Sequence, residues 1–363
     1  MPSSRFWVLQ GSKPGDNAQA LRLASASGEP FATRRIVVKP AFEQAKPRIQ
    51  ASLQHIDLEA SEPLIPPWPD VVLSIGRRMA MVALWIKQQS PTTRLVQIGP
   101  AKREAEKFDL IVVPLHYRVR EAANICRIGL PLLGVEPERL ASESERFAPQ
   151  LAKLPKPLTV FLAGGSTGSH SLDPETAGEL LHKIDEFRQR EGGSIFVTTS
   201  RRTPTDSADA LSQALPPGAQ LHCWKPDDPD NPYLGLLAHG DRFVVTGDSI
   251  SMLIEVARLG KPLAIASLRP ANRTVAMALR ALKLPRSWVW AVSRIAGEII
   301  ERTSLGSGAG SRDFSLLHEL MYEKGWAVPF GAPFAAPIYP PPDDVAIAAA
   351  RLRALLAEDQ RRT

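Results

Sequence analysis

The residues best placed to do chemistry surround a turn, Thr246-Gly-Asp-Ser249, between an apolar run and a helical pattern. Asp248, Ser251 and Glu255 are spaced i, i+3, i+7 and would share one face of that helix. N–H groups at a helix start bind phosphate, and a carboxylate one turn in suits ribose hydroxyls. A capped helix with ordinary surface polar groups has the same pattern. The predicted nucleotide ligands are Gly247, Asp248, Ser249, Ser251 and Glu255.

Two more turns in the second half of the chain also follow predicted strands. The segment Ala163-Gly-Gly-Ser-Thr-Gly-Ser-His170 has small residues that let a diphosphate approach the backbone, although it matches neither the P-loop nor the dinucleotide fingerprint. The segment Val197-Thr-Thr-Ser-Arg-Arg-Thr-Pro204 adds hydroxyl groups and two arginines, whose planar guanidinium groups match phosphate oxygens. The predicted diphosphate ligands are Gly164, Gly165, Ser166, Thr199, Ser200, Arg201 and Arg202.

The first half of the chain has two turns of the same kind. In Gln10-Gly-Ser-Lys-Pro-Gly-Asp-Asn17, Asp16 is the only carboxylate, so it is the candidate general base for an acceptor hydroxyl, with a plain helix cap as the alternative. In Ser74-Ile-Gly-Arg-Arg78, two arginines open a helix, where the helix dipole disfavours them unless an anion or an acidic neighbour compensates. The predicted acceptor or anion ligands are Gly11, Lys13, Gly15, Asn17, Arg77 and Arg78.

The elements that position these turns alternate between short apolar strands and amphipathic helices, which predicts parallel sheets with helical crossovers. We expect strands at 5–10, 34–38, 71–75, 94–98 and 110–113, with helices at 17–27, within 42–53 and at 77–88. The second series has strands at 158–163, 194–199, 220–223, 242–246 and 263–266, and helices at 174–190, 206–214, 233–239, 249–259 and 273–282. A flexible loop at 304–311, a proline-rich extended segment at 328–342 and a helix at 345–356 complete the prediction.

Two Rossmann-like domains with a C-terminal helix that crosses back form a glycosyltransferase-B-like α/β fold, with its site in a cleft between the domains. The predicted domains are 1–140 on the acceptor side and 158–330 on the nucleotide-sugar side. A linker at 141–157 and a proline-rich and helical end at 331–363 complete the organisation. Length supports two domains rather than one, because a typical domain has about 150 residues.

Composition narrows the function classes. The formal net charge of +6 favours anionic partners, among them phosphorylated ligands and acidic membrane surfaces. No nucleic-acid-binding signature accompanies that charge, so we expect no nucleic-acid partner. The two cysteines have no metal-type spacing, and neither a secretory signal nor a long apolar run is evident. We therefore expect a cytoplasmic protein that has no metal and no resident cofactor.

Four motifs together resemble the mitochondrial fission (elongated-mitochondria) family. They are Ser74-Ile-Gly-Arg-Arg78, Phe108-Asp-Leu-Ile-Val-Val-Pro-Leu-His116, Thr199-Ser-Arg-Arg-Thr-Pro204 and Thr246-Gly-Asp-Ser-Ile-Ser-Met252, and the resemblance covers about residues 5–330. It implies a glycosyltransferase-B-like fold. Plant members of the family promote mitochondrial division through a dynamin-related partner, and many bacterial members are labelled as nucleoside-diphosphate-sugar epimerases.

The segment from Thr246 to Pro262 is also distantly similar to UDP-N-acetylglucosamine 2-epimerases, which have Asp-Ser-Gly-Gly, then Glu, then Gly-Lys-Pro. The similarity implies that the turn at Asp248 and Ser249 holds diphosphate and that Glu255 holds ribose. Ile250 and Ser251 replace the paired glycines of that motif, which weakens the case for the epimerase reaction itself.

The leading hypothesis is a metal-independent glycosyltransferase with a uridine-based nucleotide-sugar donor as its co-substrate. A lipid-linked or acidic acceptor would place it as a peripheral protein at the inner face of a membrane. One alternative is a non-catalytic interaction protein on the same fold, with a protein partner. Another is a nucleotide-sugar epimerase or hydrolase.

Overall fold

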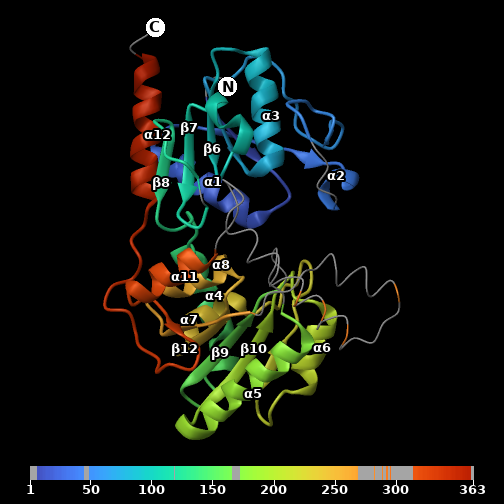
Figure 1. The fold of residues 1–363 in the computed structure, drawn as a ribbon, viewed down its shortest axis with the longest axis vertical. Coiled ribbons are helices and arrows are strands. Elements are labelled where there is room, and N and C mark those ends of the chain that lie inside the picture. The colour runs from blue at the N-terminus through green and yellow to red at the C-terminus, as the bar shows by residue number, and fades with distance from the viewer. Residues whose placement is uncertain are drawn as a thin grey trace. The chain divides into compact units, whose positions relative to one another are not determined.

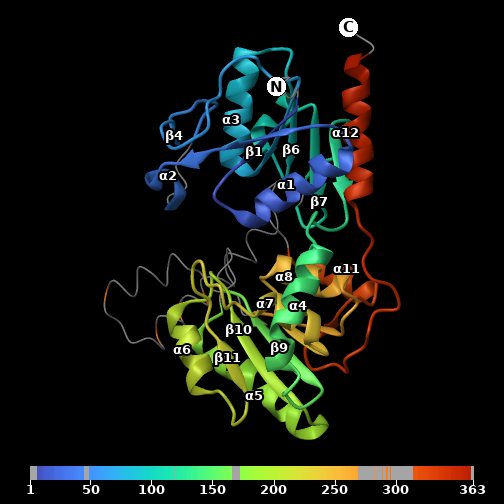
Figure 2. The same cartoon turned by 180° about the vertical axis from the view of Figure 1, so that it is seen from behind.

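The computed structural model describes residues 6–44, 49–117, 119–165, 172–268 and 314–360, and the single positions 282, 288, 292 and 295. These residues divide into two compact units. The first contains the described parts of Met1–Leu133 and Asp343–Thr363, and the second those of Gly134–Gly308 and Phe314–Pro342. Figures 1 and 2 show the elements of both units from opposite sides.

The first unit is built on a parallel sheet of six strands in the order β2-β1-β5-β6-β7-β8. The strands are β1 (Phe6–Gln10), β2 (Ala32–Arg35), β5 (Val71–Ile75), β6 (Arg94–Ile98), β7 (Leu110–Pro114) and β8 (Ile125–Ile128). Helix α1 (Pro14–Ser27) covers one face and α3 (Gly76–Gln89) the other, with the 3-10 helix η1 (Lys102–Lys107) after β6. Successive side chains point to opposite faces, so Trp7 and Val8 enter different apolar clusters.

Three boundaries in this unit differ from the predicted ones. The strand expected at 34–38 is two strands, because β2 ends at Arg35 and β3 (Val37–Val38) pairs instead with β4 (Ile56–Asp57) in a separate antiparallel sheet. Helix α1 begins three residues early, since a proline fits the first turn of a helix. The helix expected within 42–53 is the short α2 (Pro40–Gln44).

The stretch 141–157 was expected to be a linker but is largely helical. Helix α4 (Pro137–Leu151) belongs to the second unit and packs against α7 (Tyr233–His239). Its polar residues misled the sequence-based assignment, because only Phe147 and Leu151 are buried along it. A Cβ on Gly235 would lie 2.6 Å from the Cβ of Phe147, so the two helices approach closely at a glycine.

The second unit has a parallel sheet of six strands in the order β11-β10-β9-β12-β13-β14, which is the strand order 3-2-1-4-5-6 of Rossmann folds. The strands are β9 (Leu158–Ala163), β10 (Ser194–Thr199), β11 (Gln220–His222), β12 (Arg242–Thr246), β13 (Leu263–Ala266) and β14 (Val328–Pro329). The other helices among the described residues of this unit are α5 (Pro174–Glu191), α6 (Thr205–Gln213), α8 (Ile250–Arg258) and α11 (Phe314–Glu323). The helix expected at 273–282 and the loop at 304–311 lie outside the continuously described residues.

The C-terminal helix α12 (Val345–Gln360) returns to the first unit and packs against α1. Arg94 Nη1 donates to the carbonyl oxygen of Leu355 at 2.9 Å, and buried Asp344 accepts from Leu130 N at 2.9 Å. No described helix has both the length and the hydropathy that crossing a membrane requires. Two successive Rossmann-like sheets and a returning helix confirm the predicted glycosyltransferase-B-like α/β fold, and the cleft between the units stays a prediction.

Candidate functional site

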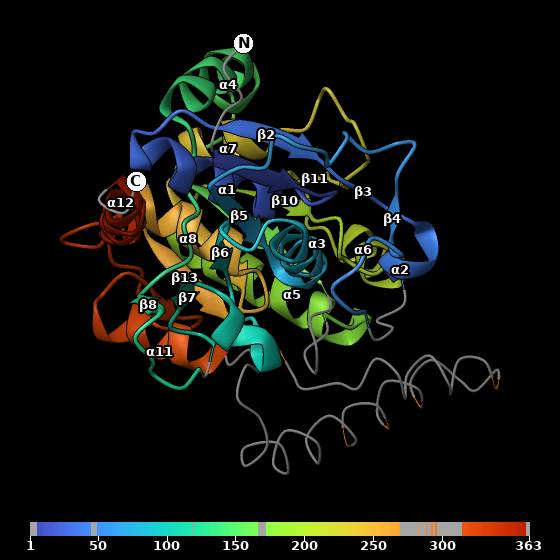
Figure 3. The same cartoon turned by 90° about the horizontal axis from the view of Figure 1, so that it is seen from above.

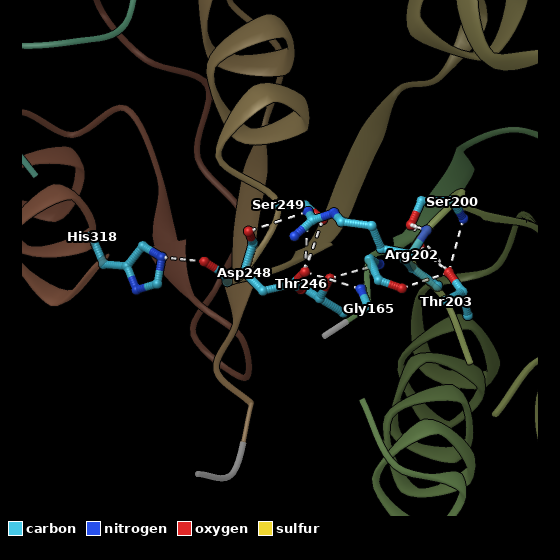
Figure 4. A network of polar contacts seen from close by, with 11 residues as sticks. Gly165, Ser200, Arg202, Thr203, Thr246, Asp248, Ser249 and His318 are labelled. Carbon is cyan, nitrogen blue, oxygen red and sulfur yellow. Dashed lines mark hydrogen bonds and ion pairs between the residues drawn. The ribbon is translucent and has the colours of Figure 1, made fainter. Parts of the chain in front are cut away.

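The candidate site lies at the carboxyl edge of the second sheet. Strands β9 and β12 are neighbours there, although the chain forms β10 and β11 between them. Open α/β sheets bind ligands at such a reversal of strand order. The loops after β9, β10 and β12 meet at this point in one polar network (Figure 4), and Figure 3 gives a view from above of α6 and α8, which follow two of these loops. The structure therefore brings together three of the turns singled out by the sequence.

The glycine amides predicted to bind diphosphate are already hydrogen-bonded to side chains of the loop after β12. Gly164 N donates to Thr246 Oγ1 at 2.8 Å, and Gly165 N donates to Asp248 Oδ2 at 2.9 Å (Figure 4). In this structure the two amides therefore hold the β9 and β12 loops together, which is a different task from the predicted one. Ser166 lies outside the described residues.

Close backbone packing explains why glycine occupies both positions. A Cβ on Gly164 would lie 2.1 Å from Ser249 Oγ and 2.4 Å from Asp248 Oδ1. A Cβ on Gly165 would lie 1.9 Å from the carbonyl oxygen of Arg202. No side chain fits at either place without moving the neighbouring loops.

Asp248 is the buried centre of the network. It is only 3% exposed, and its Oδ2 lies 3.2 Å from Arg202 Nη2. Its Oδ1 has no hydrogen-bond partner among the described residues. Burial raises the pKa of Asp248, and the Arg202 charge opposes that rise. The sequence placed Asp248 on one helix face with Ser251, but α8 begins only at Ile250, so Asp248 precedes the helix while Ser251 is exposed on it.

The arginines after β10 differ from each other. Arg202 Nη2 donates to Ser249 Oγ at 3.3 Å and to the carbonyl oxygen of Asp248 at 3.4 Å, and its side chain is 36% exposed. Arg201 is exposed. One arginine therefore ties two loops together, and the other faces solvent.

The hydroxyl groups of this loop have structural partners. Thr199 Oγ1 accepts from Trp224 N at 2.8 Å, and Ser200 N donates to Thr203 Oγ1 at 2.8 Å. Thr203 Oγ1 in turn donates to Ala163 O at 3.0 Å and so connects the loop to β9. Sequence reasoning did not single out Thr203, although a hydroxyl three residues after Ser200 is a signal for such a turn.

The amino end of α8 has no side-chain cap. Ser249 is the N-cap residue and makes no capping bond, and the first amide with an intrahelical acceptor is that of Leu253, which donates to Ser249 O at 3.0 Å. By helix geometry, the amides of Ile250, Ser251 and Met252 have no acceptor within the helix. These amides can bind an anion.

His318 of α11 supports the same turn from the other side. Its Nε2 lies 2.8 Å from the carbonyl oxygen of Gly247, as Figure 4 shows. A Cβ on Gly247 would lie 2.7 Å from His318 Cε1, which explains the glycine. The two residues are far apart in the sequence, and no local pattern pointed to His318.

Glu255, predicted to hold ribose, is paired with a tyrosine that sequence reasoning missed. The Tyr233 hydroxyl donates to Glu255 Oε2 across α7 and α8. Burial raises the pKa of Glu255 from 4.5 to about 7, while the bond from Tyr233 acts to lower it. Burial and the Glu255 carboxylate also raise the pKa of Tyr233. Near neutral pH the carboxyl group is therefore close to its midpoint of ionisation.

In the first unit, the turn after β1 is closed by Asn17. Gly11 N donates to Asn17 Oδ1 at 3.0 Å, and Asn17 Nδ2 donates to Gly11 O at 2.8 Å. Asp16 Oδ2 lies 3.5 Å from Lys13 Nζ, and the side chain of Asp16 is 35% exposed. The expected cap is wrong, because Lys13 is the N-cap residue and Asp16 lies inside the first turn of α1. Gly15 has no atom within 4 Å of a Cβ built on it.

Two predicted ligands at the start of α3 lie near the same edge of the first sheet. Asp16 Oδ2 would be 3.7 Å from a Cβ on Gly76, so the turns after β1 and β5 are neighbours. Arg78 Nε donates to Phe42 O at 2.8 Å and its Nη2 donates to Glu43 O at 2.6 Å, so carbonyls of α2 compensate its charge. Arg77 is exposed. Backbone oxygens therefore already accept from Arg78, and an anion at this position stays a prediction.

Among the described residues, no group of three or more His, Cys, Asp or Glu side chains is arranged to hold a metal ion. The absence of a metal from the function stays a prediction.

Comparison of the sequence with known proteins identifies a family and two relatives. The sequence profile of the family described as Mitochondrial fission ELM1 matches residues 14–293. The uncharacterized protein RP120 of Rickettsia prowazekii is 25% identical over 297 residues, which cover 72% of this chain and 82% of that protein. Mitochondrial fission protein ELM1 of Arabidopsis thaliana is 24% identical over 312 residues, 80% of this chain. The chain spans 64% of the plant protein, less than two thirds of its length.

Solved structures are similar over nearly the whole chain. UDP-GlcNAc 2-epimerase from Neisseria meningitidis, bound to UDP-GlcNAc, is 12% identical with a TM-score of 0.48, covering 97% of this chain and 99% of that one. MurG from Acinetobacter baumannii is 13% identical with a TM-score of 0.42, covering 98% and 100%. The family profile covers more than half of the sequence, in agreement with the four motifs, and the chain therefore belongs to the Mitochondrial fission ELM1 family.

Proposed function

We propose that the second unit binds a nucleotide-diphosphate sugar, with uridine as its base, at the carboxyl edge of the sheet. The observation that carries this proposal is the uncapped amino end of α8 at the strand reversal between β9 and β12. The amides of Ile250, Ser251 and Met252 would receive the diphosphate, and Arg202 would supply a cation beside Ser249. Exposed Arg201 would meet the outer phosphate oxygens.

The ribose would bind at Glu255. The Glu255 carboxyl group accepts a hydrogen bond from the Tyr233 hydroxyl, so a ribose hydroxyl could donate to the same carboxyl oxygen in its place. Gly164, Gly165 and Asp248 then act as the support that fixes the turn, because their polar atoms face one another. The proposal thus keeps the predicted site and changes the role of three residues in it.

The proposed reaction is transfer of the sugar to an acceptor without a metal ion. Helix amides and Arg202 would stabilise the charge that develops on the departing nucleotide. Asp16, half-buried at the carboxyl edge of the first sheet, would take the proton of the acceptor hydroxyl. We propose a lipid-linked or acidic acceptor at a membrane surface, reached from the cytoplasm. Asp16→Asn should then abolish transfer while leaving donor affinity unchanged, and unchanged turnover would contradict the role of Asp16.

The test of the donor site is calorimetric titration of the purified protein with UDP and UDP-GlcNAc. Arg202→Ala should weaken binding by at least about tenfold, because a hydrogen bond to a charged group contributes about 1.5–3 kcal/mol. Arg190→Ala is the matched control, since Arg190 is exposed in the last turn of α5. Arg201→Ala adds a variant that breaks no loop contact. No heat with either ligand, or equal affinities for all variants, would contradict the proposal.

A non-catalytic interaction protein is the second candidate, and one observation favours it. The two glycine amides that would contact a diphosphate are bonded to Thr246 and Asp248 instead. One relative is named for mitochondrial fission, which is a role other than sugar transfer. Under this reading a double variant of Asp248 and Glu255 keeps partner binding, and no UDP is released from UDP-sugars with any acceptor.

A further inference from the structure

A separate cavity of about 340 Å³ lies on the first unit. It adjoins the edge strand β2, which pairs with β1, and the proline-rich loop that leads into β5. The lining residues are Trp7, Arg34, Glu62, Pro63, Ile65, Pro66 and Pro67. The volume is within the range of about 300–1,000 Å³ that is usual for small-molecule sites.

The guanidinium group of Arg34 supplies a cation to this cavity and lies over the ring of Trp7. Its guanidinium carbon lies 4.4 Å from the centroid of the Trp7 ring, and its Nη1 donates to Thr33 O at 3.0 Å. No acidic group in the described part of the chain forms an ion pair with it. A guanidinium has five N–H donors in one plane, so a stacked Arg34 still has donors for a planar carboxylate or a phosphate.

The carboxylate in the cavity is engaged with the strand edge. Glu62 Oε2 accepts from Arg35 N at 2.7 Å, and Glu62 N donates to Arg35 O at 2.9 Å. These bonds fix its position beside β2. An anion that binds Arg34 would still feel the Glu62 charge, so neutralising Glu62 should tighten the binding of an anion.

The remaining lining is apolar and rigid. Ile65 is 63% exposed, and the prolines around it have fixed φ angles. Exposed apolar surface beside a stacked guanidinium suits a ligand that has a flat apolar body and one anionic group. We propose that this cavity binds such an organic anion, an aryl carboxylate or aryl phosphate, independently of the nucleotide site.

The test titrates the full chain calorimetrically with 2-naphthoate, 2-naphthyl phosphate and the neutral 2-naphthamide. The anions should bind with one-to-one stoichiometry, and the amide should bind at least about tenfold more weakly. Arg34→Ala should reduce anion affinity by a similar factor, and Glu62→Gln should increase it. Arg35→Ala is the matched control, because neighbouring residues of β2 point to opposite faces.

Arg34→Lys is a second, milder variant in case Arg34→Ala disturbs the fold. Lysine retains the positive charge but lacks the planar guanidinium group that stacks on Trp7, so this variant should also weaken anion binding. Unfolding temperatures of all variants should match that of the wild type. Equal affinities for the anions and the amide, equal effects of Arg34→Ala and Arg35→Ala, or displacement of the naphthyl anions by UDP would overturn the proposal.

Discussion

Replacing Glu255 with glutamine should change how the stability of the protein depends on pH. Burial raises the pKa of Glu255 from 4.5 to about 7 in the folded protein, which corresponds to about 3 kcal/mol of free energy of unfolding. A raised pKa means that the folded state binds the proton more tightly. The stabilisation is therefore complete below about pH 4.5, falls as the pH rises through 7, and is absent above that value.

Glutamine resembles the protonated carboxyl group and cannot ionise, so the variant should not lose stability as the pH rises through 7. Relative to the wild type, Glu255→Gln should gain up to about 3 kcal/mol at a pH above 7 and little at a pH below 4.5. Urea unfolding followed by circular dichroism across this range measures the difference. Glu145→Gln is the control, because Glu145 is exposed on α4 in the same unit.

Comparing variant with wild type at each pH cancels the contributions of other groups, such as His55, whose pKa burial lowers. If Glu255→Gln and wild type show the same pH dependence, Glu255 does not have a raised pKa and the reasoning from its burial is wrong.

The remaining predictions concern the network around α8 and the ligand. Gly165→Ala should cost about 1–3 kcal/mol through overlap with the Arg202 carbonyl, whereas Gly178→Ala, open around its Cβ, should raise the unfolding temperature. Asp248→Ala should cost about 1–3 kcal/mol, because it removes the acceptor of the buried Gly165 amide and the carboxylate beside Arg202, and equal costs for alanine and asparagine would refute this. Asparagine should cost less, since its oxygen can keep both bonds while its NH₂ group takes the place of the unpartnered Oδ1. Calorimetry should show UDP affinity rising with pH through about 7, because an ionised Glu255 accepts ribose hydroxyls better.

The architecture was predictable from the sequence because most of the parallel strands are short, buried and mainly apolar runs separated by helices. Strand β12, for instance, is buried at all five positions and ends at a turn with Gly247 and Asp248. Helix α4 was missed for the opposite reason, because its many charged residues are those of a linker and only two of its side chains are buried. The two-residue strands β3 and β4 are too short to give any periodic signal.

The residues of the candidate site were predictable, but most of their partners were not. Glycine, hydroxyl and arginine residues after strands identified three loops that contact one another in the structure. Whether an amide such as Gly165 N meets a ligand or a carboxylate depends on contacts between residues far apart in the chain. The same is true of Tyr233 beside Glu255 and of His318 beside Gly247, because no local spacing connects either pair.

The most direct test of the central claim is amide chemical-shift mapping by NMR during titration with UDP. The account predicts saturable shifts at Ile250, Ser251 and Met252, with a smaller change at Gly165, whose amide stays bonded to Asp248. Saturable shifts confined to the first unit, or none at all, would contradict the placement of a nucleotide at the amino end of α8.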